Sequence, residues 1–123
     1  MGRIRPTTLA LMDLNDYQKT AAQTAVYPGS GTGNITALAY VGLGLGEAGE
    51  VQGKIKKLMR DKRGTIEDGD RIAIAKELGD LLWYVAMAAR EIDLPLQTVA
   101  QMNLNKLESR AARGVLGGSG DDR

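Results

Sequence analysis

The sequence has no cysteine and no histidine among its 123 residues. Sites for zinc, copper or iron-sulfur clusters depend on thiolate or imidazole ligands, so the composition excludes sites of those kinds. The lack of cysteine also excludes a disulfide framework and agrees with a reducing cytoplasm. Any metal site must therefore use oxygen ligands, which favours Mg²⁺ or Mn²⁺ first and Ca²⁺ second.

Strong net charge and long apolar runs are lacking as well. The formal net charge is only +1, so no overall charge attracts nucleic acid or an anionic membrane. No run approaches the roughly 20 apolar residues of a membrane span, and the apolar stretch at residues 9–12 is too short for a secretory signal. We expect a soluble cytoplasmic protein with a single domain over residues 1–123.

Helical periodicity and turn residues predict an all-α protein, and nothing in the sequence favours a strand. Residues 114–123 are rich in glycine and are expected to form a short flexible tail unless something ties them down. The remaining core, about residues 15–113, is expected to form a four-helix bundle-like fold. The expected helices cover about residues 15–26, 36–60, 68–92 and 95–113, with turns near residues 28–34, 64–69 and 93–95.

Two acidic pairs are the main functional signal. Glu47 and Glu50 form the first pair, and Glu77 and Asp80 form the second. Residues three apart share a helix face, with Cβ atoms roughly 5–6 Å apart, so two adjacent helices can bring four carboxylates to one point. Because like charges repel, such a group requires a cation. The four acids are therefore candidate ligands of Mg²⁺.

The second predicted helix carries two other stripes. A row of glycines suggests close approach of another helix or of a ligand, because glycine costs about 1 kcal/mol in a helix interior relative to alanine. The glycine row consists of Gly42, Gly46, Gly49 and Gly53, and the expected core face consists of Val41, Leu45, Ala48, Ile55 and Met59.

The third predicted helix is apolar nearly all round, which predicts burial nearly all round. Asp80 is the only charged residue between Leu78 and Ala89. An ionised carboxylate buried without a partner costs several kcal/mol, so Glu77 and Asp80 are expected to hold a cation. Glu47 and Glu50, considered alone, could instead lie on a solvated helix face and bind no metal.

Basic residues flank the acids in two places. Lys54 and Lys57 follow Glu50 on the same side of the second helix, within a basic run over residues 54–63. They are candidates for binding phosphate oxygens, although such a run is also typical of a solvated helix end. In the fourth helix Asn103, Lys106 and Arg110 share one face and allow the same two interpretations.

These motifs together resemble the MazG-like branch of the all-α nucleoside triphosphate pyrophosphohydrolases. The resemblance covers about residues 15–116 and rests on E-x-x-E at 47–50, E-x-x-D at 77–80 and the residues around them. It implies Mg²⁺-dependent cleavage of the α-β phosphoanhydride of a nucleoside triphosphate, and assembly as a homodimer or homotetramer. It also implies metal ligands at Glu47, Glu50, Glu77 and Asp80, and phosphate contacts from Lys54, Asn103, Lys106 and Arg110.

Several alternatives stay open at this level. Either Glu47 or Glu50 could orient or deprotonate the attacking water. The substrate could instead be dCTP, dUTP or phosphoribosyl-ATP, and a non-catalytic helical module could use the basic run to contact nucleic acid. Candidates to border a base are Tyr17, Thr24, Tyr27, Trp83 and Tyr84, although aromatic residues at such spacings are more often core.

Overall fold

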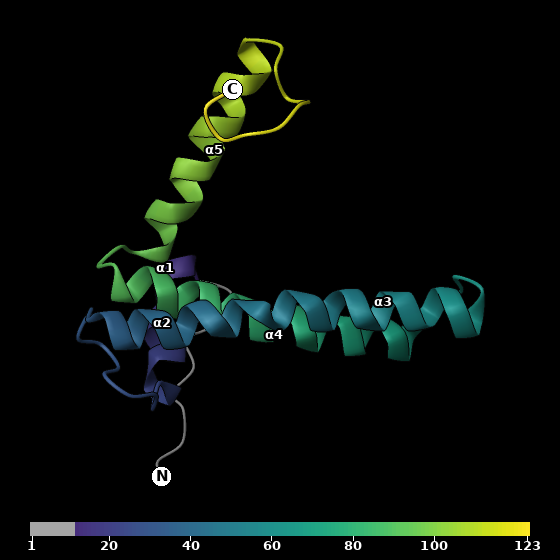
Figure 1. Ribbon diagram of the computed structural model, residues 1–123, viewed down its shortest axis with the longest axis horizontal. Coiled ribbons are helices and arrows are strands. Elements are labelled where there is room, and N and C mark those ends of the chain that lie inside the picture. The colour runs from purple at the N-terminus through teal and green to yellow at the C-terminus, as the bar shows by residue number, and fades with distance from the viewer. Residues whose placement is uncertain (1–11) are drawn as a thin grey trace.

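The computed structural model describes residues 12–123 and is all-α, with no strand in that range (Figure 1). The predicted fold class is therefore confirmed, while the expectation for the apolar stretch at residues 9–12 falls largely outside the described residues. No helix in the described range is both long and apolar enough to cross a bilayer. The α-helices are α1 (Leu14–Ala21), α2 (Ile35–Gly44), α3 (Ala48–Lys62), α4 (Asp68–Glu91) and α5 (Leu96–Ala112), with 3₁₀ turns η2 (Ala22–Thr24) and η3 (Leu45–Glu47).

Side-chain caps define where several helices begin. Asp13 and Asp16 form a reciprocal capping box at the start of α1, with nitrogen-to-oxygen distances of 2.8 and 3.1 Å. Asn34 caps α2 by accepting from the backbone N–H of Ala37 at 2.9 Å. Each cap satisfies amide donors that the first turn of a helix leaves unpaired.

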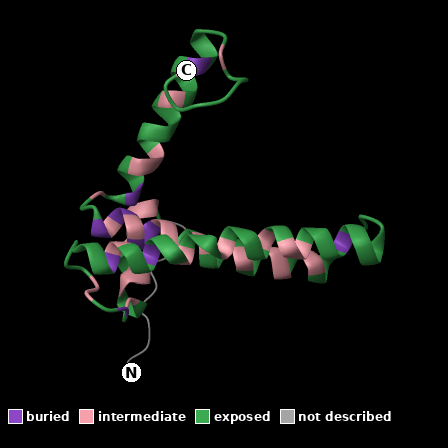
Figure 2. Cartoon of the chain, in the orientation of Figure 1, coloured by how far each residue is buried: buried purple, intermediate pink, exposed green. Residues whose placement is uncertain are grey.

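The buried core is small and lies where α1, α2, the C-terminal half of α4 and the start of α5 meet (Figure 2). From this junction the paired α3 and α4 extend in one direction and α5 extends in another (Figure 1). Outside the junction, few of the described side chains are buried. The core cluster consists of Tyr27, Ala37, Val41, Ala86, Met87, Ala89 and Leu96.

A buried carboxylate fixes the loop that precedes α2. Glu91, only 5% exposed, accepts hydrogen bonds from the Tyr27 hydroxyl and from the backbone N–H groups of Gly31 and Gly33, the last two at 2.9 Å. Burial alone raises the pKa of Glu91, but these hydrogen bonds and the charge of Arg90 hold that pKa below its usual value. The loop is thus anchored to the end of α4.

The predicted core face of the second helical segment is wrong for most of its residues. Val41 is fully buried, whereas Ile55 and Met59 are 45% and 70% exposed. The 3₁₀ turn η3 separates α2 from α3, and its residues turn by about 120° each instead of about 100°. This change of phase rotates the apolar side chains of α3 away from the face that Val41 occupies.

The predicted burial of the third segment also holds for only half of it. In α4 the side chains from Ala86 onward reach the core, but Leu78 is 49% exposed and Asp80 is exposed. A helix of 24 residues is about 36 Å long, which exceeds the small core at the junction. The first half of α4 therefore packs mainly against α3 and keeps an open apolar side.

The glycine row predicted to allow close approach is open in this chain. A Cβ atom added at Gly42, Gly46, Gly49 or Gly53 would meet nothing within 4 Å. Close packing within this helical segment instead requires glycine at Gly44, at the end of α2, where an added Cβ would lie 2.0 Å from a ring carbon of Tyr84. Gly44 thereby lets the Tyr84 ring lie directly against the backbone of α2.

Candidate metal centre and nucleotide site

Three of the four predicted acidic ligands meet where η3 packs against α4. Glu47 ends η3, while Glu77 and Asp80 lie one turn apart on α4. Each offers one carboxylate oxygen, and the three oxygens all lie within 4.8 Å of one another. Glu47 and Glu77 are partly buried and Asp80 is exposed, so this acid cluster opens to solvent.

Glu50 lies one turn further along α3, is exposed and does not belong to the acid cluster. Its charge nevertheless acts on Glu47. Partial loss of hydration raises the pKa of Glu47, and the negative charges of Glu50, Glu77 and Asp80 raise it further. A divalent cation placed among these carboxylates would relieve that repulsion.

The donor set of the acid cluster fits Mg²⁺ or Mn²⁺. All three donors are carboxylate oxygens, which suit hard cations. Ligand oxygens around Mg²⁺ lie about 2.9 Å apart when adjacent and about 4.2 Å apart when opposite, given metal-oxygen distances of 2.0–2.1 Å. Separations of up to 4.8 Å reach these values through modest side-chain rotation, so the residues can hold the ion.

Lys54 supplies a positive charge at the edge of the acid cluster. Its Nζ lies 3.7 Å from Oε1 of Glu77, and the two side chains are 39% and 20% exposed. The ammonium balances part of the cluster's negative charge and leaves Lys54 within reach of an anion bound beside the carboxylates.

An open hollow of about 430 Å³ adjoins the acid cluster and is lined by Glu47, Asp80, Trp83 and Tyr84. Its volume lies within the usual range of small-molecule sites. The Trp83 indole N–H donates to the Thr24 hydroxyl at 2.9 Å, which fixes the ring. Burial raises the pKa of Tyr84, and the nearby Tyr40, Glu47 and Asp80 add to this effect.

The other aromatic candidates differ in position. Burial raises the pKa of Tyr17, and the charge of Asp80 raises it further, so the phenol of Tyr17 lies near the acid cluster. Tyr27 is a core residue instead, because it is buried, bonds to Glu91 and stacks on Tyr40 with ring centroids 5.3 Å apart. The structure thus gives Tyr27 a structural role and leaves Trp83 and Tyr84 beside the site.

Much of the basic run is already paired with acids. Besides the Lys54–Glu77 pair, Arg60 binds Asp61 at 2.8 Å and Lys62 binds Asp70 at 3.0 Å. Lys57, also predicted to bind phosphate, is exposed and lines a second hollow together with Lys54 and Lys62. These pairs reduce the positive field that a nucleic-acid surface would need.

The three polar residues predicted on the fourth helix lie on α5, which diverges from α3 and α4 (Figure 1). Asn103 and Lys106 line a separate hollow with Ile92 and Val99. A single chain therefore does not bring these side chains to the acid cluster.

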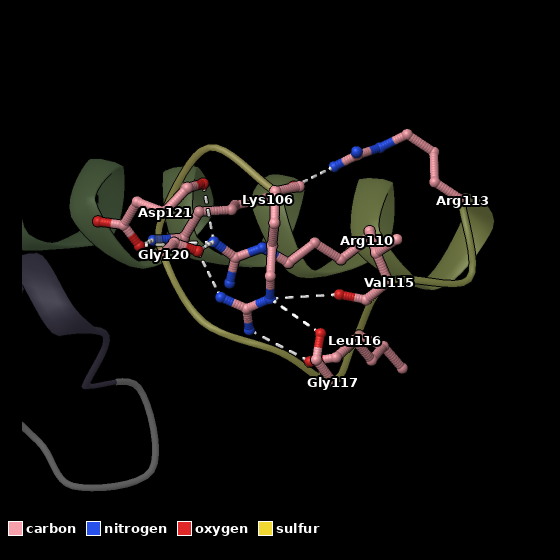
Figure 3. A network of polar contacts seen from close by, with 9 residues as sticks. Lys106, Arg110, Arg113, Val115, Leu116, Gly117, Gly120 and Asp121 are labelled. Carbon is pink, nitrogen blue, oxygen red and sulfur yellow. Dashed lines mark hydrogen bonds and ion pairs between the residues drawn. The ribbon is translucent and has the colours of Figure 1, made fainter.

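Lys106 and Arg110 instead contact Asp121, near the end of the chain, with the Lys106 Nζ 3.0 Å from the Asp121 carboxylate (Figure 3). The sequence did not predict this contact. No short-range pattern indicates it, because Asp121 reaches α5 only through the path of the intervening loop.

The fold and the acid cluster define an all-α, carboxylate-rich domain, and comparison with known proteins gives its family. The model of the MazG nucleotide pyrophosphohydrolase domain matches residues 36–115, and the chain belongs to this family. A curated relative, the Gene 37 protein of Mycobacterium phage L5, is 52% identical over 114 residues, covering 91% of this chain and 100% of that protein. No solved structure matches the chain.

Proposed function

We propose that the protein is a Mg²⁺-dependent pyrophosphohydrolase that cleaves the α-β phosphoanhydride of ribo- or deoxyribonucleoside triphosphates to the monophosphate and pyrophosphate. The observation that carries this proposal is the acid cluster of Glu47, Glu77 and Asp80, with Lys54 beside it, in a domain of the MazG family. Carboxylates for metal and lysine for phosphate are sufficient equipment, because phosphoryl transfer asks a protein mainly for positioning and charge stabilisation.

We assign each residue of the site a role according to its position. Glu47, Glu77 and Asp80 would hold Mg²⁺, which supplies charge neutralisation at the phosphates and lowers the pKa of water. Lys54 would move from Glu77 to a phosphate oxygen, a charge-assisted contact, and Lys57 would bind a phosphate further along α3. Glu50, outside the acid cluster but close enough to act on Glu47, would orient or deprotonate the attacking water.

Pyrophosphate release from a panel of nucleoside triphosphates tests the activity. With Mg²⁺ the protein should release pyrophosphate from at least one member of a panel that includes dCTP, dUTP and phosphoribosyl-ATP. Asp80→Asn should lower turnover by at least about 100-fold, since removal of a ligand disables the metal. Asp68→Asn, the same change at an exposed acid in the first turn of α4, should have no effect. Absence of release across the panel from folded protein would refute the proposal.

We also propose that two copies of the chain share each active site. Within one chain Lys106 and Arg110 lie on α5, which extends away from the paired α3 and α4 (Figure 1). Large apolar side chains are left open on the other helices, among them Leu43 on α2, Met59 on α3 and Ile72 on α4. A homodimer or homotetramer would cover them and would bring cations from one copy to the acids of another.

Mixing two inactive variants tests whether the site is shared. Glu77→Gln keeps the cations of α5, and Arg110→Gln keeps the acid cluster. If a dimer carries two shared sites, random mixing with subunit exchange should restore about a quarter of wild-type activity, because half of the dimers are mixed and one of their two sites is intact. A mixture as inactive as its components would show that each chain forms its site alone. Light scattering on the same samples gives the oligomeric state.

A further inference from the structure

Residues 114–123, named here the return segment, fold back along the last turns of α5 (Figure 3). Gly114 turns the chain with φ at 71°. The guanidinium of Arg123 donates to the carbonyl oxygens of Val115, Leu116 and Gly117 at 3.1–3.3 Å, and to that of Gly120. Arg113 adds a further contact, because its Nη2 donates to the backbone oxygen of Arg123 at 2.7 Å, and the two arginines together close the segment into a loop.

The closed loop places a carboxylate against the basic side chains of α5. Asp121 lies with its carboxylate 3.0 Å from the Lys106 ammonium and 3.4 Å from the Arg110 guanidinium. Arg110 is only 5% exposed, which is unusual for arginine and means that the return segment covers it. The loop therefore occupies two side chains, Lys106 and Arg110, for which the family resemblance implies contacts to phosphate.

The return segment does not pair with every hydrogen-bond donor of Arg110. Its Nη2 atom donates to the backbone oxygens of Gly120 and Asp121 and to the Asp121 carboxylate, at 2.8–3.4 Å. Its Nε is buried and has no hydrogen-bond partner. Guanidinium binds oxyanions best through two parallel N–H donors, and a phosphate can accept from both. Arg110 thus retains an unused donor that a bidentate phosphate would engage.

We propose that the return segment is an internal competitor for the anion site of Lys106 and Arg110, with the Asp121 carboxylate standing where a phosphate group of the nucleotide or the released pyrophosphate binds. This inference rests on the proposed function for the identity of the ligand. The Asp121 side chain is 83% exposed, so its ion pairs are weak and exchangeable. A phosphate then binds only when the segment is open. The apparent affinity for phosphate is therefore the intrinsic affinity multiplied by the fraction of open molecules.

Three full-length variants separate this competition from a structural role of the return segment. Asp121→Asn removes the competing charge. Arg123→Gln loosens the loop without touching Lys106 or Arg110. Asp122→Asn makes the same charge change one residue later, at an exposed acid. Inorganic pyrophosphate binding is measured by calorimetry without divalent cations, so that the acid cluster cannot retain the anion, and kcat and KM are measured with Mg²⁺.

Asp121→Asn and Arg123→Gln should each bind pyrophosphate about three to ten times more tightly than wild type and lower KM by the same factor, with kcat unchanged. Asp122→Asn should match wild type in both assays. Equal pyrophosphate affinity in wild type and Asp121→Asn would overturn the inference even if hydrolysis is normal. Tighter pyrophosphate binding without hydrolysis of any nucleotide would uphold the inference and refute the proposed function instead.

Discussion

Replacing Gly44 by alanine tests the packing that places Tyr84 beside the acid cluster. Gly44 has φ −61° and ψ −25°, which alanine adopts freely, so any penalty comes from the new methyl group. That methyl would lie 2.0, 2.1 and 2.6 Å from three ring atoms of Tyr84. The Tyr84 ring must therefore move by more than an ångström. The Trp83 ring already packs edge-on against it, with the two ring centroids 5.1 Å apart.

The expected cost combines two opposing effects. Overpacking costs about 1–3 kcal/mol, whereas the higher helix propensity of alanine returns up to about 1 kcal/mol. Gly44→Ala should therefore lower the free energy of unfolding by about 1–2 kcal/mol and Tm by about 4–8 °C. Because Tyr84 lines the hollow next to Glu47 and Asp80, KM for the nucleotide should rise as well.

Gly42→Ala is the matched control on the same helix, since an alanine Cβ there would meet nothing within 4 Å. This variant should be more stable than wild type by about 0.5–1 kcal/mol, through helix propensity alone. Thermal unfolding followed by circular dichroism at equal protein concentration compares the two variants. If Gly44→Ala melts at or above the Tm of Gly42→Ala, the Tyr84 ring does not pack on Gly44 and the reasoning is refuted.

Glu91→Gln should lower the free energy of unfolding in urea by about 2–4 kcal/mol, because an amide cannot accept all the hydrogen bonds that the buried carboxylate receives. The folded pKa of Glu91 is lowered, so its stabilisation is present above the unfolded pKa of about 4.3 and is lost as pH falls through the folded value. The difference between wild type and Glu91→Gln should accordingly shrink below about pH 4, and a constant difference down to pH 2 would contradict this. Asn34→Ala should cost about 1 kcal/mol through loss of the α2 cap, whereas Asn34→Gly should cost only a few tenths. Saturating Mg²⁺ should raise Tm by several degrees in wild type but not in Glu77→Gln, as scanning fluorimetry would show.

The helices could be predicted from the sequence because their signals are local. Turn residues such as Gly64 and Pro95, and helical periodicity between them, gave four segments that correspond to α1, α2 with α3, α4 and α5. The core face of α3 could not be predicted, because a 3₁₀ turn of three residues shifts the helical phase by about 60° relative to Val41. Nothing in the sequence around Gly44 marks that shift.

Part of the candidate site could likewise be predicted from local spacing, and part of it could not. Glu77 and Asp80 were placed on one helix face by their spacing, and the structure brings Glu47 to them. The exclusion of Glu50 from the acid cluster depends on how η3 meets α4, which spacing does not determine. The contact between Arg110 and Asp121 depends on the three-dimensional path of a loop, so only the structure could reveal it.

The extended pair of α3 and α4 is expected to open locally more readily than the core. Among the described side chains of α3 only Leu58 is buried, so little apolar contact within the chain opposes fraying at the turn near Gly64. In an isolated chain, amide hydrogens in this region should exchange with solvent much faster than those of the core around Met87. If subunits pack over these helices, exchange there should slow as protein concentration rises while exchange at Met87 stays unchanged, so amide exchange rates at one end of the molecule would report its assembly.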